Sequence, residues 1–212
     1  MSAIAAMIVL TLDAALPGCS AGLVRDGDVV AERYLDGARG HAAALPAMAS
    51  AVLAEAGIEA AALYMVAVTI GPGSFTGLRA ALSLAHGIGA AAGVPVAGVT
   101  VGEALDGPAD GRLHWAAVDT RRGRVFLDCG GEVRSVALDG LPTPGRPLTV
   151  GGDAGAAVAE RLAGAGCDVR LGQARPGPAG IAAAALRRIA AGLAPRPAQP
   201  LYVDPPEARP AA

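Results

Sequence analysis

The sequence predicts a two-lobed α/β protein whose halves open with the same strand pattern. Apolar strands alternate with helical segments, 53% of the 212 residues are hydrophobic, and a strand ending in Asp, a short turn and a returning strand occurs twice. This composition supplies apolar surface for a sizeable core. A pattern repeated at half the chain length indicates a duplicated architecture. We therefore expect a first lobe over residues 1–106, a reduced second lobe over 107–204 and a loose tail over 205–212.

In the first half, branched apolar runs separated by turn residues predict strands, and apolar side chains at three- and four-residue spacing predict helices. The expected strands are 7–12, 19–24, 29–35, 63–70 and 94–99. The expected helices are 41–55 and 74–92.

The second half repeats the opening. Its first strand ends at Asp119, as the first strand of the chain ends at Asp13, and in both cases a short glycine-containing turn and a second strand follow. Further on we expect a strand at 148–150, helices at 154–162 and 179–193, and a short strand at 201–203.

The composition excludes several kinds of chemistry. The chain contains no lysine, so neither a P-loop nor a Schiff-base enzyme is possible. A net charge of -2 gives no general attraction to nucleic acid or to an anionic membrane. The three cysteines, Cys19, Cys129 and Cys167, lack paired spacing, which favours a reducing cytoplasm over a disulfide framework or a zinc site. Glycines and Pro95 interrupt the uncharged stretch 80–102, so we expect no membrane span.

Three segments are candidates for ligand binding, each with a structural alternative. Gly71-Pro72-Gly73 places backbone amides at the start of the helix from Ser74, where an anion is favoured, but the glycines equally suit a tight turn. Asp13 and Asp119 could hold Mg²⁺ between two lobes, although Pro17 removes an amide from the first turn. Gly151 and Gly152 could support a nucleotide or simply turn the chain from strand to helix. The three histidines are too far apart in sequence to predict a metal site.

Two helices carry almost no charge. Residues 41–53 contain no Asp, Glu or Arg, and 74–92 contain only Arg79. A helix on the surface of a protein in water normally shows the solvent a polar face, so either the rest of the chain buries this pair or a partner does. We favour a protein interface. Its expected contact residues are Leu45, Met48, Val52, Phe75, Leu78, Arg79 and Leu82.

One segment of the sequence is highly specific, GPGSFTGLR at 71–79. It is supported by LDAALPGCSAGL at 12–23, GVPVAGVT at 93–100, AAVDTRRGRVF at 116–126 and QPLYVD at 199–204. Together these segments resemble the TsaB (YeaZ) family, whose members are paralogues of the TsaD transferases. The resemblance implies an actin-like (ASKHA) nucleotidase fold and a cytoplasmic role in forming threonylcarbamoyladenosine in tRNA.

The resemblance also implies partners. It suggests a non-catalytic scaffold that dimerises with TsaD and stabilises it, with a TsaE-like ATPase as a further partner, tRNA bound through the complex, and a homodimer when the chain is alone. We expect no cofactor on the isolated chain, and leave open ATP or ADP with Mg²⁺ at an interface shared with the partner. The alternative is an enzyme, either ATP-binding or a glycoprotease-like metallopeptidase. Against the peptidase, Thr100-Val101-Gly102-Glu103 stands where TsaD-like proteins carry paired histidines.

Overall fold

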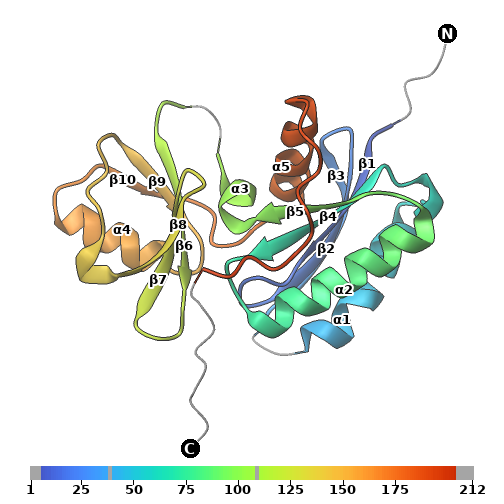
Figure 1. The fold of residues 1–212 in the computed structure, drawn as a ribbon, viewed down its shortest axis with the longest axis horizontal. Coiled ribbons are helices and arrows are strands. Elements are labelled where there is room, and N and C mark those ends of the chain that lie inside the picture. The colour runs from blue at the N-terminus through green and yellow to red at the C-terminus, as the bar shows by residue number, and fades with distance from the viewer. Residues whose placement is uncertain (1–5, 38–39, 108–109, 204–212) are drawn as a thin grey trace, which may run out of the picture.

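The computed structural model describes residues 6–37, 40–107 and 110–203, and it contains two five-stranded sheets side by side (Figure 1). The first sheet has the order β3-β2-β1-β4-β5 and the second β10-β9-β6-β7-β8. The first consists of β1 (Ile8–Asp13), β2 (Cys19–Arg25), β3 (Asp28–Leu35), β4 (Met65–Gly71) and β5 (Val96–Thr100). The second consists of β6 (Leu113–Asp119), β7 (Arg124–Cys129), β8 (Val133–Ala137), β9 (Leu148–Gly151) and β10 (Val169–Leu171).

The two sheets have the same topology. In each, an antiparallel three-strand meander pairs through its first strand with a parallel strand, and that strand pairs in parallel with an edge strand. The duplication expected from the sequence is therefore present in the structure. We call each sheet, with the helices packed on it, a lobe.

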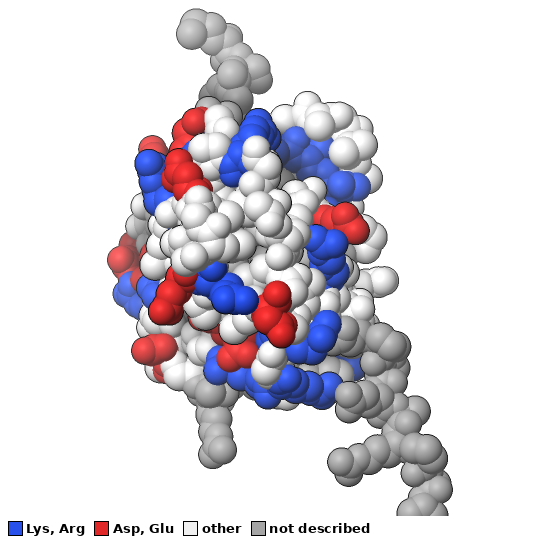
Figure 2. Space-filling view, turned by 90° about the vertical axis from the view of Figure 1, so that its left-hand side faces the viewer, with Lys and Arg blue, Asp and Glu red and all other residues white. Residues whose placement is uncertain are grey.

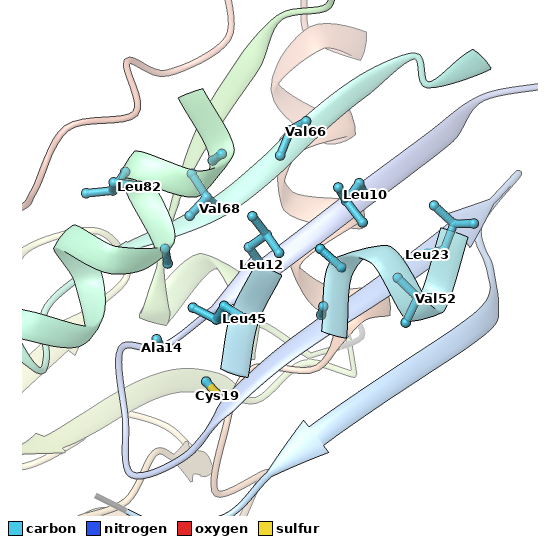
Figure 3. Close-up of a cluster of buried hydrophobic side chains, with 14 of the residues drawn as sticks. Leu10, Leu12, Ala14, Cys19, Leu23, Leu45, Val52, Val66, Val68 and Leu82 are labelled. Atoms are coloured by element: carbon cyan, nitrogen blue, oxygen red, sulfur yellow. The ribbon is translucent and has the colours of Figure 1, made fainter. Parts of the chain in front are cut away.

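Helices cover both faces of the first sheet. On one face lie α1 (His41–Glu55) and α2 (Phe75–Ala92), which pack with Leu10, Leu12 and Val68 (Figure 3). The opposite face packs against α5 (Pro178–Ala190), beside the short helix α3 (Val101–Leu105). Because both faces are covered, every residue of β1 is buried. In the second lobe, α4 (Gly155–Gly164) packs on its sheet.

The last part of the chain returns to the first lobe. Helix α5 belongs to the residues expected for the second lobe, yet it packs on the first sheet. The segment after it, residues 194–202, then runs along the outer edge of β5, where the amide of Gly98 donates to the carbonyl of Arg196 over 2.8 Å. Ala198 of this segment is buried in the core beneath α2. We call residues 194–202 the strap.

Besides two single-turn 3-10 helices, Ala60–Ala62 and Leu138–Gly140, three short elements were not expected from the sequence. Helix α3 begins with a capping box in which the Thr100 and Glu103 side chains each bond to the other residue's amide. Strands β8 and β10 lie at the two edges of the second sheet and are mostly half-buried or exposed, so they lack an apolar pattern. The strand expected at 201–203 is wrong, because that segment belongs to neither sheet; the Leu201 amide donates to the Ile70 carbonyl, but no strand forms there.

Candidate functional site

The elbow from β4 to α2 is packed against the turn between β1 and β2. Gly71 has φ +115°, and a Cβ atom added to Gly77 would lie 2.2 Å from the carbonyl oxygen of Ala14. The Ser74 amide donates to the Ala15 carbonyl over 2.7 Å, while the Ser74 hydroxyl caps α2 by accepting from the Gly77 amide. The glycines thus permit close backbone contact, and two amides at the elbow, those of Ser74 and Gly77, already have partners.

The second lobe repeats this arrangement where β9 meets α4. Gly152 has φ +96°, and a Cβ atom there would lie 2.1 Å from the carbonyl oxygen of Ala117. That carbonyl also accepts from the Ala154 amide over 3.1 Å. A Cβ atom on Gly151 would lie 2.7 Å from the Gln173 carbonyl oxygen. Close packing accounts for both glycines.

Asp13 and Asp119 each fix the turn that follows their strand. The Asp13 carboxylate is buried and accepts from the Ala15 amide over 3.1 Å and from the Thr69 hydroxyl over 2.5 Å. The Asp119 carboxylate accepts from the Arg121 amide over 2.8 Å, two residues on, as Asp13 does from Ala15. These are Asx turns, which aspartate commonly forms with its own backbone.

Asp119 also belongs to an ion-pair group. The Arg121 guanidinium lies 3.2 Å from the Asp119 carboxylate and 3.3 Å from that of Asp153. Burial raises the pKa of Asp153, and the hydrogen bond from the Asp119 amide opposes that rise. Arg121 contacts both carboxylates and offsets part of their negative charge, so the three side chains form an ion-paired group.

Apolar side chains fill the junction between the lobes. Leu16 of the first turn, Leu78 of α2 and Val118 of β6 are all at most 4% exposed and belong to one cluster. Phe126 and Leu105 pack against it. A nucleotide brings phosphates and a polar ribose, so these residues do not fit ATP or a Mg²⁺ ion between the two turns. Across the described part of the chain, no group of three or more His, Cys, Asp or Glu side chains is placed to hold a metal ion.

The uncharged helices do lie side by side, but most of the expected contact residues face inward (Figures 1 and 3). Leu45, Val52 and Leu82 are at most 5% exposed in the core above the first sheet, and Leu78 is buried at the lobe junction. Met48 is half-buried, with its sulfur 3.9 Å from that of Cys19. We therefore correct the expected interface, because these five side chains mainly stabilise the chain's own fold. Phe75 and Arg79 are exposed.

What the pair offers to a partner is a surface of small residues, which we call the helix-pair face. Its exposed members are Ala43, Pro46, Ala47, Ser50, Ala54, Phe75, Thr76, Arg79, Ser83, His86, Gly87, Ala90 and Ala91. Arg79 is its only fixed charge, while Glu55 at the end of α1 pairs with Arg33 of β3. By contrast, the end of the molecule formed by the second lobe carries basic and acidic side chains interspersed (Figure 2).

One contact on this face had no sequence signal. Arg79 donates through Nη2 to the Tyr202 hydroxyl over 2.8 Å, although the two residues are 123 positions apart. Only the path of the strap brings Tyr202 to α2. No helix in the described residues is long and apolar enough to span a membrane.

Comparison with known proteins agrees with this architecture. Residues 32–137 match the family model for TsaD, tRNA N6-adenosine threonylcarbamoyltransferase. An uncharacterised protein of Mycobacterium tuberculosis is 36% identical over 100% of this chain and 99% of its own length. The tRNA threonylcarbamoyladenosine biosynthesis protein TsaB of Escherichia coli is 32% identical over 57% of this chain and 53% of its own length.

Solved structures give the same result. YeaZ from Pseudomonas aeruginosa superimposes with a TM-score of 0.74 at 26% identity, covering 92% of this chain and 99% of that one. Two lobes built on sheets of the same topology form the actin-like (ASKHA) fold expected from the sequence, which is thereby confirmed. From the family model, the aligned relatives and the fold, we conclude that this chain belongs to the TsaB (YeaZ) family, whose relatives act in tRNA threonylcarbamoyladenosine biosynthesis.

Proposed function

We propose that this chain is a non-catalytic scaffold in tRNA threonylcarbamoyladenosine biosynthesis, which docks on a TsaD-type transferase through the helix-pair face and stabilises it. The observation that carries the proposal is this face, where two adjacent helices expose small, uncharged residues around a single arginine. Small residues let the helices of a partner approach closely, and depletion of charge is typical of an interface core.

The lobe junction supports the non-catalytic part of the proposal. The Ser74 and Gly77 amides of the elbow have partners, Asp13 and Asp119 hold turns, and apolar side chains fill the space between the lobes. No observation favours the ATP-binding or peptidase alternative. We infer that a nucleotide with Mg²⁺, where one is used, binds at a surface shared with the transferase. A TsaE-like ATPase and tRNA would then join the complex through the transferase, in the cytoplasm.

The test places a charge on the helix-pair face without touching the core. Ala47 of α1 and Ser83 of α2 are exposed, so Ala47→Glu and Ser83→Glu leave the fold intact. Each should weaken binding to the transferase of the same organism by at least about tenfold, because the new carboxylate would be buried without a partner. Titration calorimetry measures the affinity, and size-exclusion chromatography shows the complex.

The matched control is Ala156→Glu, at an exposed position of α4 in the other lobe. It should bind the transferase as the wild-type chain does. Equal binding by all three variants would place the interface elsewhere, and no binding by the wild-type chain would overturn the proposal. Self-association of the chain alone, which we expect through the same face, is measured by sedimentation of the same variants.

A further inference from the structure

Two aromatic side chains stand out on the surface of the described residues. Phe75 is 61% exposed and Tyr202 is 58% exposed, the two highest values among the large hydrophobic side chains described. Both contact the same arginine. The guanidinium carbon of Arg79 lies 3.4 Å from the Phe75 ring centroid, and Arg79 Nη2 donates to the Tyr202 hydroxyl over 2.8 Å. We call these three residues the aromatic cluster.

The aromatic cluster is held in place from two sides. Phe75 and Arg79 lie one turn apart on α2, whose first turn is capped by Ser74. Tyr202 ends the strap, which is fixed by the bond from the Leu201 amide to the Ile70 carbonyl and by His86 Nε2, 2.9 Å from the Ala198 carbonyl oxygen. Side chains that are ordered before binding lose little conformational entropy when a partner covers them.

Arg79 makes fewer hydrogen bonds in the described part of the chain than its guanidinium allows. A guanidinium has five N–H donors, and in the described part of the chain Arg79 contacts only the Phe75 ring and the Tyr202 hydroxyl, with no carboxylate nearby. It is also the only fixed charge on the helix-pair face. A partner that covers this face must therefore provide an acceptor for Arg79, and a carboxylate is the best match in charge and geometry.

We propose that the aromatic cluster is the anchor of the helix-pair interface. It inserts into an apolar pocket of the TsaD-type transferase, where a carboxylate of the transferase accepts from Arg79. Phe75 supplies most of the buried apolar area, and Tyr202 acts as a positioning residue that orients the guanidinium. Phe, Tyr and Arg beside small residues match the composition of interface hot spots. The inference rests on the proposed function.

The experiment measures affinity for the transferase of the same organism by titration calorimetry, using the full chain. Phe75→Ala should weaken binding by about 30-fold, as expected for a hot-spot residue. Tyr202→Phe removes one hydroxyl and should weaken it by about fivefold. The matched controls are Leu171→Ala, an exposed apolar residue of β10, and Tyr64→Phe, an exposed tyrosine outside the aromatic cluster. Both controls should bind as the wild-type chain does.

A double-mutant cycle tests the positioning role. If the Tyr202 hydroxyl acts through Arg79, then Tyr202→Phe should cause no further loss in an Arg79→Gln chain. A full additional loss would overturn that role. Thermal unfolding of each variant should match the wild type, since all three residues are exposed.

The outcomes separate the two proposals. Wild-type binding with unchanged affinity for Phe75→Ala and Tyr202→Phe would overturn the anchor but leave the scaffold. Absence of wild-type binding would overturn both. Variants that lose only self-association, measured by sedimentation, would assign the aromatic cluster to a second copy of the chain and overturn the anchor on the transferase.

Discussion

At the scale of single residues, Asp128 is a carboxylate whose pKa is shifted by burial against closely packed backbone. It lies on β7 with 4% exposure and accepts from the Gly131 amide over 2.7 Å. A Cβ atom on Gly102 of α3 would lie only 2.0 Å from its Oδ2. Burial, followed by the negative charges of Glu103 and Asp106, raises the pKa of Asp128, against the opposing hydrogen bond from Gly131.

This shift predicts a pH-dependent stability. Because the folded-state pKa of Asp128 is raised, the folded protein holds the proton more tightly than the unfolded chain does. The contribution of Asp128 therefore favours folding most below the unfolded-state pKa, which is about 3.9, and is lost as the pH rises through the folded-state value. Asp128→Asn avoids this loss, so it should be more stable than the wild type near neutral pH.

Urea unfolding at a series of pH values measures the effect. The advantage of Asp128→Asn should shrink as the pH falls towards about 4. Asp139→Asn, at an exposed aspartate of the same lobe, serves as the control and should show no such advantage. A stability difference that is constant with pH would contradict the assigned cause.

At the scale of elements, two of the three glycines in α2 have opposite roles. Gly77 faces the β1–β2 turn with the carbonyl oxygen of Ala14 in the way of any Cβ atom, whereas a Cβ atom on Gly87 would meet nothing within 4 Å. Gly87→Ala should therefore stabilise the protein by about 0.5–1 kcal/mol, the usual gain in a helix interior.

Gly77→Ala should instead destabilise it by about 1–3 kcal/mol, because overpacking outweighs the helical preference. Chemical denaturation of the two variants compares the same substitution in one helix. If Gly77→Ala proved as stable as Gly87→Ala, close packing would not explain the glycine in the elbow.

The helices also show which structural features the spacing of apolar residues predicts. The spacing of Leu45 and Val52 predicted α1 with the bounds that the structure has, because large apolar side chains at that spacing form one stripe. The same spacing sends that stripe into the core, as it does for Leu78 and Leu82 of α2. The interface was expected on the large residues, but of these only Phe75 and Arg79 are exposed, and the rest of the surface left for a partner consists mainly of small residues between them.

At the scale of the whole molecule, the filled lobe junction predicts that the isolated chain does not bind ATP. Leu16, Leu78 and Val118 would have to separate before a nucleotide could enter, and each is almost fully buried. Titration calorimetry of the chain alone with ATP and Mg²⁺ should show no heat of binding. Binding that disappears in Asp13→Ala would instead support the enzyme alternative.

The sequence by itself determined the strands and the two long helices of the first half, and the duplication. Those features depend on local patterns: apolar runs for buried strands, helical spacing, and turn residues after Asp13 and Asp119. They do not depend on which segments meet in space.

Only the tertiary structure decided what the candidate site residues do. That Gly73, Gly77 and Gly152 make room for neighbouring backbone, that apolar side chains fill the lobe junction, and that α5 returns to the first sheet all depend on contacts between distant segments. The clearest case is Tyr202, which reaches Arg79 through the strap. The side chain that orders the surface of α2 comes from the far end of the chain, so no local pattern contains that contact.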